Sequence, residues 1–128
     1  MNIKELEKDL EFIKHLFEDE GSLKMKSIAT FDEDFTYRGF KHIKVGDISL
    51  SIQASYGNYC TPRKTLKNLN EYTSMEFALI GEEGRFLNVN DVLPNFEKLD
   101  IINEYFDGSV YSYVPVELIE ELYNEFVK

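Results

Sequence analysis

The chain has 128 residues and a formal net charge of −10 at pH 7, and 43% of its residues are hydrophobic. This composition predicts a single folded domain, 1–128, and excludes a disordered chain. The one cysteine cannot form an internal disulfide, charged residues throughout 1–20 argue against a signal peptide, and no run approaches the roughly 20 apolar residues of a membrane helix. The sequence therefore predicts a cytoplasmic protein without a membrane segment.

The negative charge is concentrated at the two ends of the chain. Residues 1–20 carry a net charge of −4 and residues 97–128 a net charge of −6, whereas 21–96 is neutral. Such a field disfavours contact with phosphates, so we expect no direct binding of nucleic acid. It favours encounter with a protein that has a basic surface. The alternative is that these acids only keep the protein soluble.

The N-terminal residues predict an amphipathic helix. Apolar residues recur three and four apart from Ile3 to Leu16, after a capping residue at Asn2, so we expect a helix to about residue 19. Its last turn places three acids at the negative end of the helix dipole: Glu18, Asp19 and Glu20. These acids form either a contact point or a frayed, solvated helix end.

Residues 22–56 predict an antiparallel meander. The pattern indicates a hairpin over 23–38 with acids at its tip, a strand continuing to Val45, and a turn at Gly46 and Asp47. The next strand, 48–56, alternates without a fault between an apolar face and a face of short polar side chains. The polar face comprises Ser49, Ser51, Gln53 and Ser55. If helices cover the apolar face, the polar face is left for water or a partner.

The remaining segments predict further strands and helices. After a loop over 64–73 with one helical turn, we expect strands over 74–80 and 85–87 joined by a turn at 81–84, and a brief helical turn at 90–93. A helix then runs from Asn95 to Gly108, a strand from 110 to 114, and a final helix from Pro115. The predicted class is α+β, an antiparallel sheet of about five to six strands with N-terminal and C-terminal helices packed on one face.

Catalytic and metal motifs are weak. Cys60 is the one candidate nucleophile, but neither His15 nor His42 can be placed beside it from sequence, so a buried apolar role is the preferred interpretation. One cysteine and two histidines at wide spacing do not make a metal site, and no phosphate-binding loop is present. We therefore expect a protein that is not an enzyme and needs no metal or cofactor.

Polar and aromatic residues converge around the end of the 48–56 strand. Tyr and Arg are the types most enriched at binding hot spots, and the same set could hold a small anion such as a nucleotide. The candidate binding residues are Gln53, Tyr56, Asn58, Tyr59, Arg63 and Lys64, with Arg38 as a possible neighbour. The competing interpretation is structural, with the tyrosines in the core and Arg63 paired with a helix acid.

A second candidate contact surface is acidic. It combines residues of the two terminal helices: Glu18, Asp19, Glu20, Glu117, Glu120 and Glu121. These carboxylates would face a basic channel or surface of a partner.

Three motifs also carry a resemblance. With S-I-Q-A-S at 51–55, Y-C-T-P-R at 59–63 and Y-V-P-V-E at 113–117, the chain resembles a family of small uncharacterised phage-encoded proteins over roughly residues 50–128. The resemblance transfers no catalytic residue. It implies a phage or prophage in the cytoplasm of a low-GC bacterial host, where compact acidic proteins often inhibit CRISPR or restriction nucleases.

Two hypotheses follow from the sequence. The first is a non-enzymatic anti-defence protein that binds and inhibits a host defence or nucleic-acid-handling enzyme. The alternative is a protein that binds or sequesters a small nucleotide-like ligand, with Gln53, Tyr59, Arg63 and Lys64 around it.

Overall fold

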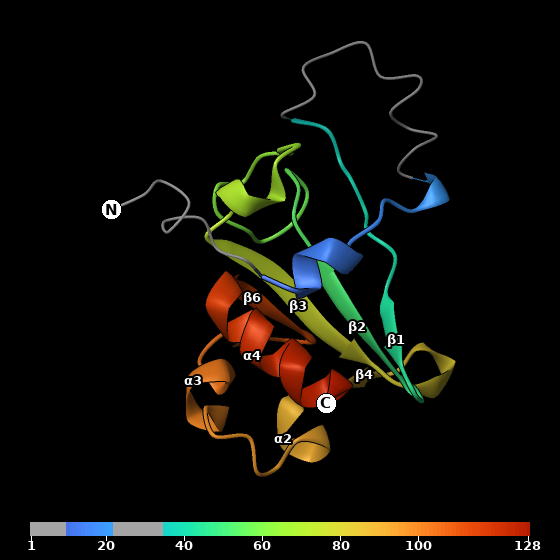
Figure 1. Ribbon diagram of the computed structural model, residues 1–128, viewed down its shortest axis with the longest axis vertical. Helices are drawn as coiled ribbons and strands as arrows, with labels where there is room; N and C mark the ends of the chain where they lie inside the picture. Colours follow the sequence, from blue (N-terminus) through green and yellow to red (C-terminus); the bar gives the residue numbers. More distant parts are fainter. Residues whose placement is uncertain (1–9, 22–34) are drawn as a thin grey trace.

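A six-stranded antiparallel sheet forms the centre of the molecule in a computed structural model that describes residues 10–21 and 35–128 (Figure 1). The strand order is β1-β2-β3-β6-β5, and β4 also pairs with β3. The strands are β1 Ile43–Val45, β2 Ile48–Gln53, β3 Ser74–Ile80, β4 Phe86–Leu87, β5 Phe106–Asp107 and β6 Val110–Pro115.

Short helices and one longer helix accompany the sheet. They are the 3₁₀ helices η2 Phe12–His15, η4 Leu69–Glu71 and η5 Glu82–Gly84, and the α-helices α2 Val89–Val92, α3 Leu99–Asn103 and α4 Val116–Val127. In Figure 1, α4 and η2 lie in front of the sheet, and α3 and α2 lie below α4, with α2 nearer its C-terminal end. The predicted α+β class with an antiparallel sheet is confirmed.

The core lies between α4 and the apolar face of the sheet. Leu50 and Ile52 of β2 are fully buried, as the alternation predicts, and Phe77 beside them on β3 is fully buried as well. From α4, Ile119 and Leu122 close this layer. Each such side chain stabilises the fold by about 1.5–3 kcal/mol on burial, so this layer is the main source of stability.

Turn chemistry places the strands as the sequence indicates. Val45 pairs with Ile48, so Gly46 and Asp47 form a two-residue hairpin turn, and Gly46 has a positive φ of 62°. A second glycine, Gly108, has φ 77° between β5 and β6. These left-handed positions favour glycine because it lacks a Cβ. The hairpins over 43–50 and 79–87 and the final helix are confirmed.

The predicted helix over 95–108 is too long. Only Leu99–Asn103 is α-helical, and Phe106 is already in a strand that pairs with Tyr111 of β6. The apolar spacing that suggested a longer helix is also satisfied by a short helix followed by a hairpin. The turn at Gly108 decides between them, because it folds β5 back onto β6.

Of residues 10–19, only the 3₁₀ helix Phe12–His15 is helical, so the predicted helix to residue 19 is too long and is wrong in its last turn. After η2 the backbone of Leu16 is extended, and Glu18 forms an antiparallel bridge with Phe40. The amide of Asp19 donates to the carbonyl of Gly39 (2.9 Å), and the amide of Lys41 donates to that of Phe17 (2.7 Å). Long-range pairing thus replaces the last helical turn. The predicted start of this helix and most of the 23–38 hairpin lie outside the described residues.

The polar face of β2 is not open along its whole length. The Gln53 side chain accepts from the amide of Phe40 (2.7 Å) and donates to the carbonyl of Phe40 (2.9 Å). If the pairing of β1 with β2 is continued beyond Ile43 and Leu50, Phe40 lies opposite Gln53. The side-chain amide of Gln53 therefore makes the two hydrogen bonds to Phe40 that a backbone peptide group would make in a sheet. Gln53 and Ser55 are buried, whereas Ser49 and Ser51 are half-buried.

We expect Gln53→Leu to lower the free energy of unfolding by about 2–4 kcal/mol, because the buried amide and carbonyl of Phe40 would lose their partner. Urea denaturation measures this loss. The matched control is Ser49→Ala on the same face, for which we expect a change within about 0.5 kcal/mol. Equal stability of Gln53→Leu and wild type would contradict the bridging role.

Candidate functional site

A buried arginine organises the loops at the end of the sheet that β2 runs into. Arg38 is 6% exposed and donates from Nη2 to the carbonyl of Ala54 (2.5 Å) and from Nη1 to that of Leu66 (2.6 Å). Its Nη2 also donates to the hydroxyl of Tyr72 (3.1 Å), and its guanidinium lies 4.7 Å from the ring centroid of Phe40. One side chain therefore fixes three separate segments of chain.

Tyr72 completes this network from the far side of the long loop. Its hydroxyl donates to the carbonyl of Lys64 (2.5 Å) and accepts from the amide of Leu66 (2.8 Å). Thr65 next to them donates to the carbonyl of Thr36 and accepts from the amide of Tyr56 (3.0 Å). The loop from 54 to 73 is thus held by side-chain bonds to main-chain groups, most of them at least partly buried, which limits its freedom.

A group of exposed rings lies on this fixed loop and around it. Edge-to-face contact joins Phe35 to Tyr56, with 5.5 Å between centroids, and Tyr59 lies 5.8 Å from Tyr113. The Arg63 guanidinium lies 5.2 Å from the Tyr59 centroid, and its Nε donates to the carbonyl of Tyr56 (3.1 Å). Arg63 therefore links the two ring pairs. We call the following set the aromatic surface: Phe35, Tyr37, Tyr56, Tyr59, Arg63 and Tyr113.

Tyr37 belongs to the aromatic surface because its ring packs against the backbone of Gly57 in the loop. A Cβ on Gly57 would lie 2.9 Å from Cδ2 of Tyr37, so the ring rests where only glycine leaves room. Burial first, and then the negative charges of Asp19 and Glu76, raise the pKa of Tyr37. Its phenol therefore stays protonated at neutral pH and can donate a hydrogen bond to a ligand.

The structure separates the predicted binding residues into two groups. Tyr56, Tyr59 and Arg63 are exposed and in contact, and Lys64 is exposed next to them. Asn58 is buried, and its side-chain oxygen accepts from the Ser55 hydroxyl (2.6 Å). Gln53 is engaged with Phe40, so neither amide belongs to the exposed surface. Among the described residues, Arg63 contacts the Tyr59 ring and the Tyr56 carbonyl and not a helix acid.

Sequence reasoning missed Phe35, Tyr37 and Tyr113 as members of the aromatic surface. Tyr113 reaches it because its backbone has φ 56°, where the register between β3 and β6 shifts. The Y-S-Y pattern at 111–113 signals two tyrosines on one face of a regular strand. The irregularity instead buries Tyr111 and exposes Tyr113, and no sequence signal marks such a shift.

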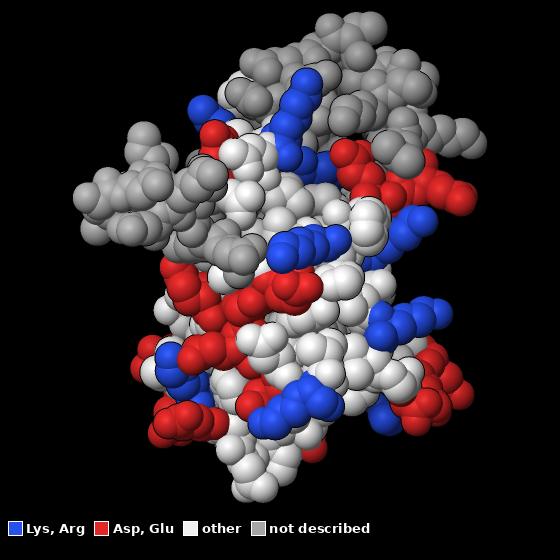
Figure 2. Space-filling view, viewed as in Figure 1, with Lys and Arg blue, Asp and Glu red and all other residues white. Residues whose placement is uncertain are grey.

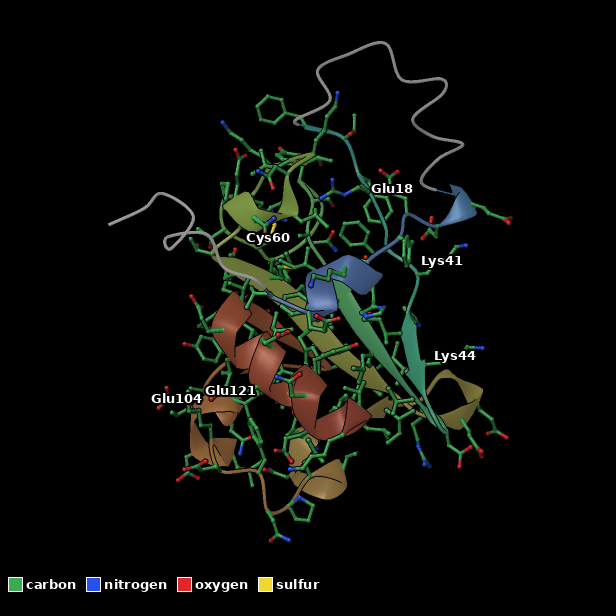
Figure 3. The ribbon with its side chains drawn as sticks, in the orientation of Figure 1. Glu18, Lys41, Lys44, Cys60, Glu104 and Glu121 are labelled. Carbon is green, nitrogen blue, oxygen red and sulfur yellow. The ribbon has the colours of Figure 1, made fainter. Side chains whose placement is uncertain are left out.

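The predicted acidic surface is divided between two places. Figure 2 shows acids gathered over the front of the molecule, where α4 lies, and Figure 3 places Glu121 beside Glu104, away from Glu18. Glu120 accepts from the amides of Glu11 (2.8 Å) and Phe12 (3.0 Å), and Glu121 pairs with Lys98 (2.9 Å). Two of these carboxylates therefore already serve internal contacts. Glu117 and Glu20 are exposed, and Asp19 is half-buried.

A pocket of about 340 Å³ lies beside the aromatic surface. Its apolar wall comes from Leu16, Phe17, Phe40 and Leu69. Its charged lining comes from Glu18, Arg38 and Lys67, and Tyr37 forms part of both the pocket and the aromatic surface.

Cys60 lies inside the loop, where Figure 3 labels it, and is 1% exposed. Its thiol donates toward the carbonyls of Ser55 (3.3 Å) and Pro62 (3.4 Å). Burial raises the pKa of the thiol more than the Ser55 bond and the charges of Arg38 and Arg63 lower it. Both of these partners are carbonyls, and neither is a base that would activate a nucleophile.

Among 10–21 and 35–128, no group of three or more His, Cys, Asp or Glu side chains is arranged to hold a metal ion. Within the same ranges, every helix is too short or too polar to cross a membrane.

Comparisons with family models, curated proteins and solved structures found no match to this chain.

We expect the stability of the protein to fall as the pH rises above about 8.5, the ordinary pKa of a thiol. The native pKa of Cys60 is raised, so in this range the unfolded chain releases a proton that the native protein retains. Cys60→Ser has no thiol to titrate, so its free energy of unfolding should fall less than that of wild type between about pH 7.5 and about pH 9.5. This range extends about one pH unit on either side of the ordinary thiol pKa. Thermal unfolding across this range measures the difference.

The same variant tests for a chemical role of the thiol. We expect native Cys60 to react slowly with a thiol reagent at pH 7 and at full speed in denaturant, and Cys60→Ser to bind partners normally. Rapid labelling of the folded protein would contradict the buried, protonated state.

We expect Glu120→Ala to lower the free energy of unfolding by about 1–2 kcal/mol, because it removes the acceptor for two amides at the start of η2. The matched control on α4 is Glu125→Ala. Its carboxylate pairs with exposed Lys128, so its loss should change stability by no more than about 0.5 kcal/mol. Chemical denaturation of both variants provides the comparison; equal effects would show that the Glu120 bonds add nothing.

Proposed function

We propose that this chain is a non-enzymatic binding protein that attaches to another protein through the aromatic surface. The observation that carries the proposal is the exposure of two ring pairs that Arg63 connects: Phe35 at 48% with Tyr56 at 49%, and Tyr59 at 39% with Tyr113 at 44%. Exposed, contiguous rings on a folded protein mark interaction sites, and Tyr and Arg dominate the binding energy at interfaces.

The fixed loop supports this function energetically. Arg38 and Tyr72 hold the main chain on both sides of the rings, so the surface is largely formed before a partner arrives. Binding then loses less conformational entropy than it would on a flexible loop. Arg63 adds a charged group that is oriented by Tyr56 and Tyr59.

The partner class we propose is a host defence or nucleic-acid-handling enzyme with a basic surface. The resemblance to phage-encoded proteins supports the setting, and the net charge of −10 supports attraction to a basic protein. Because Glu120 and Glu121 already make internal contacts, we assign to the acids of α4 the role of long-range attraction. The aromatic surface makes the direct contacts.

The small-ligand alternative does not fit the residues first assigned to it. Gln53 is buried against Phe40, whereas Tyr59 and Arg63 are exposed on the loop, and none of the three lines the pocket described above.

We expect Tyr59→Ala to weaken binding to the captured partner about 10- to 100-fold, since hot-spot tyrosines contribute roughly 1.4–3 kcal/mol. The measurement is pull-down from a lysate of a low-GC bacterium, followed by surface plasmon resonance with the purified partner. The matched control is Phe86→Ala on β4, which removes a ring that is 50% exposed, against 39% for Tyr59, from outside the aromatic surface. Phe86→Ala should bind like wild type.

The salt dependence of binding distinguishes attraction by the acids of α4 from direct contact by the aromatic surface. Raising the ionic strength should slow association by weakening the attraction of the acids, with little change in the dissociation rate. Tyr59→Ala should instead speed dissociation. Failure to capture any partner, or equal loss of binding in Phe86→Ala and Tyr59→Ala, would exclude the aromatic surface as the contact site.

A further inference from the structure

The pocket beside the aromatic surface contains an unusual charge. The guanidinium of Arg38 has no ion-pair partner among the described residues; its bonds go to two carbonyls and one hydroxyl. Its Nε is fully buried and has no hydrogen-bond partner there. A buried cation without a counter-charge is costly, and it makes its surroundings strongly attractive to an anion.

The rest of the lining favours a particular kind of anion. Lys67 adds a second positive charge at the pocket, and Phe17, Phe40 and Leu69 provide apolar walls. Glu18 also lines the pocket and repels negative charge, which disfavours highly charged anions such as triphosphates. The volume of about 340 Å³ is at the lower end of the range for small-molecule sites.

We propose that this pocket binds a small amphipathic anion, with one phosphate or carboxylate group near Arg38 and Lys67 and an aromatic or apolar body against Phe17 and Phe40. The site is separate from the Gln53 and Arg63 set. Its lining shares Tyr37 with the aromatic surface but not the exposed rings of Tyr56, Tyr59 and Tyr113, so ligand binding can be measured in the absence of the protein partner.

The test is isothermal titration calorimetry with four named probes. Adenosine monophosphate and indole-3-acetate each carry both an anionic group and an aromatic ring system. Adenosine has the ring system without the charge, and inorganic phosphate has the charge without a ring system. We expect at least one of the first two to bind with a Kd of about 1 mM or tighter, and adenosine and phosphate to bind at least about tenfold more weakly. Binding of only one of the first two identifies a phosphate ester or a carboxylate as the ligand.

Variants locate the site without disturbing the fold. Arg38→Gln removes the loop bonds and can unfold the protein, so the informative changes are Lys67→Gln and Phe17→Ala at exposed positions of the lining. Each should weaken binding about three- to tenfold. The matched control is Lys64→Gln, which is exposed nearby but outside the lining, and should bind like wild type.

Three results would overturn the proposal. They are no binding of either aromatic anion up to about 10 mM, equal affinity for adenosine and adenosine monophosphate, and unchanged binding in both Lys67→Gln and Phe17→Ala. Amide shifts in nuclear magnetic resonance spectra provide the independent readout, because a ligand at this site must shift residues 36–40 and 65–69 more than those of α4. None of these outcomes depends on whether a protein partner is captured.

Discussion

The buried guanidinium of Arg38 is the interaction on which the loop end of the molecule depends. It meets the carbonyls of Ala54 and Leu66 and the hydroxyl of Tyr72, which come from three places in the chain. A cation in a buried position needs dense hydrogen bonding, and a planar fork with five donors supplies several bonds at once. Without Arg38, the loop over 54–73 would lose its shared anchor, and Tyr56 and Tyr59 would lose their fixed positions.

The molecule divides into a packed half and a hydrogen-bonded half. Where α4 covers the sheet, burial of Ile52, Phe77 and Leu122 provides the stability. At the loop end, regular strand pairing gives way to side chains that bond main-chain groups, as Gln53 does at Phe40 and Tyr72 at Lys64. Such bonds fix conformation with little apolar burial, which leaves rings free to remain on the surface.

Sequence patterns predict the packed half well, because periodicity reports burial directly. The buried apolar positions of β2, the turn at Gly46 and the stripe of α4 appear where local patterns place them. The strand predicted over 48–56 nevertheless ends at Gln53, and Tyr56 at the end of its apolar pattern is exposed. The loop end is less predictable because its partners are distant in sequence. Nothing local shows that Gln53 bonds Phe40, or that residues 17–19 pair with 39–41 in place of a helical turn.

The candidate site follows the same division, and it inverts the expected positions of polar and aromatic residues. Gln53 and Asn58 have polar side chains suited to a surface, yet they are buried in internal bonds. Tyr56, Tyr59 and Tyr113 have the bulk of core residues, yet they are exposed. Burial of a large apolar side chain stabilises a fold by about 1.5–3 kcal/mol, and an exposed ring loses part of this stabilisation. A fold that keeps buried bonds for small polar groups and leaves its rings outside has a surface suited to contact with another molecule.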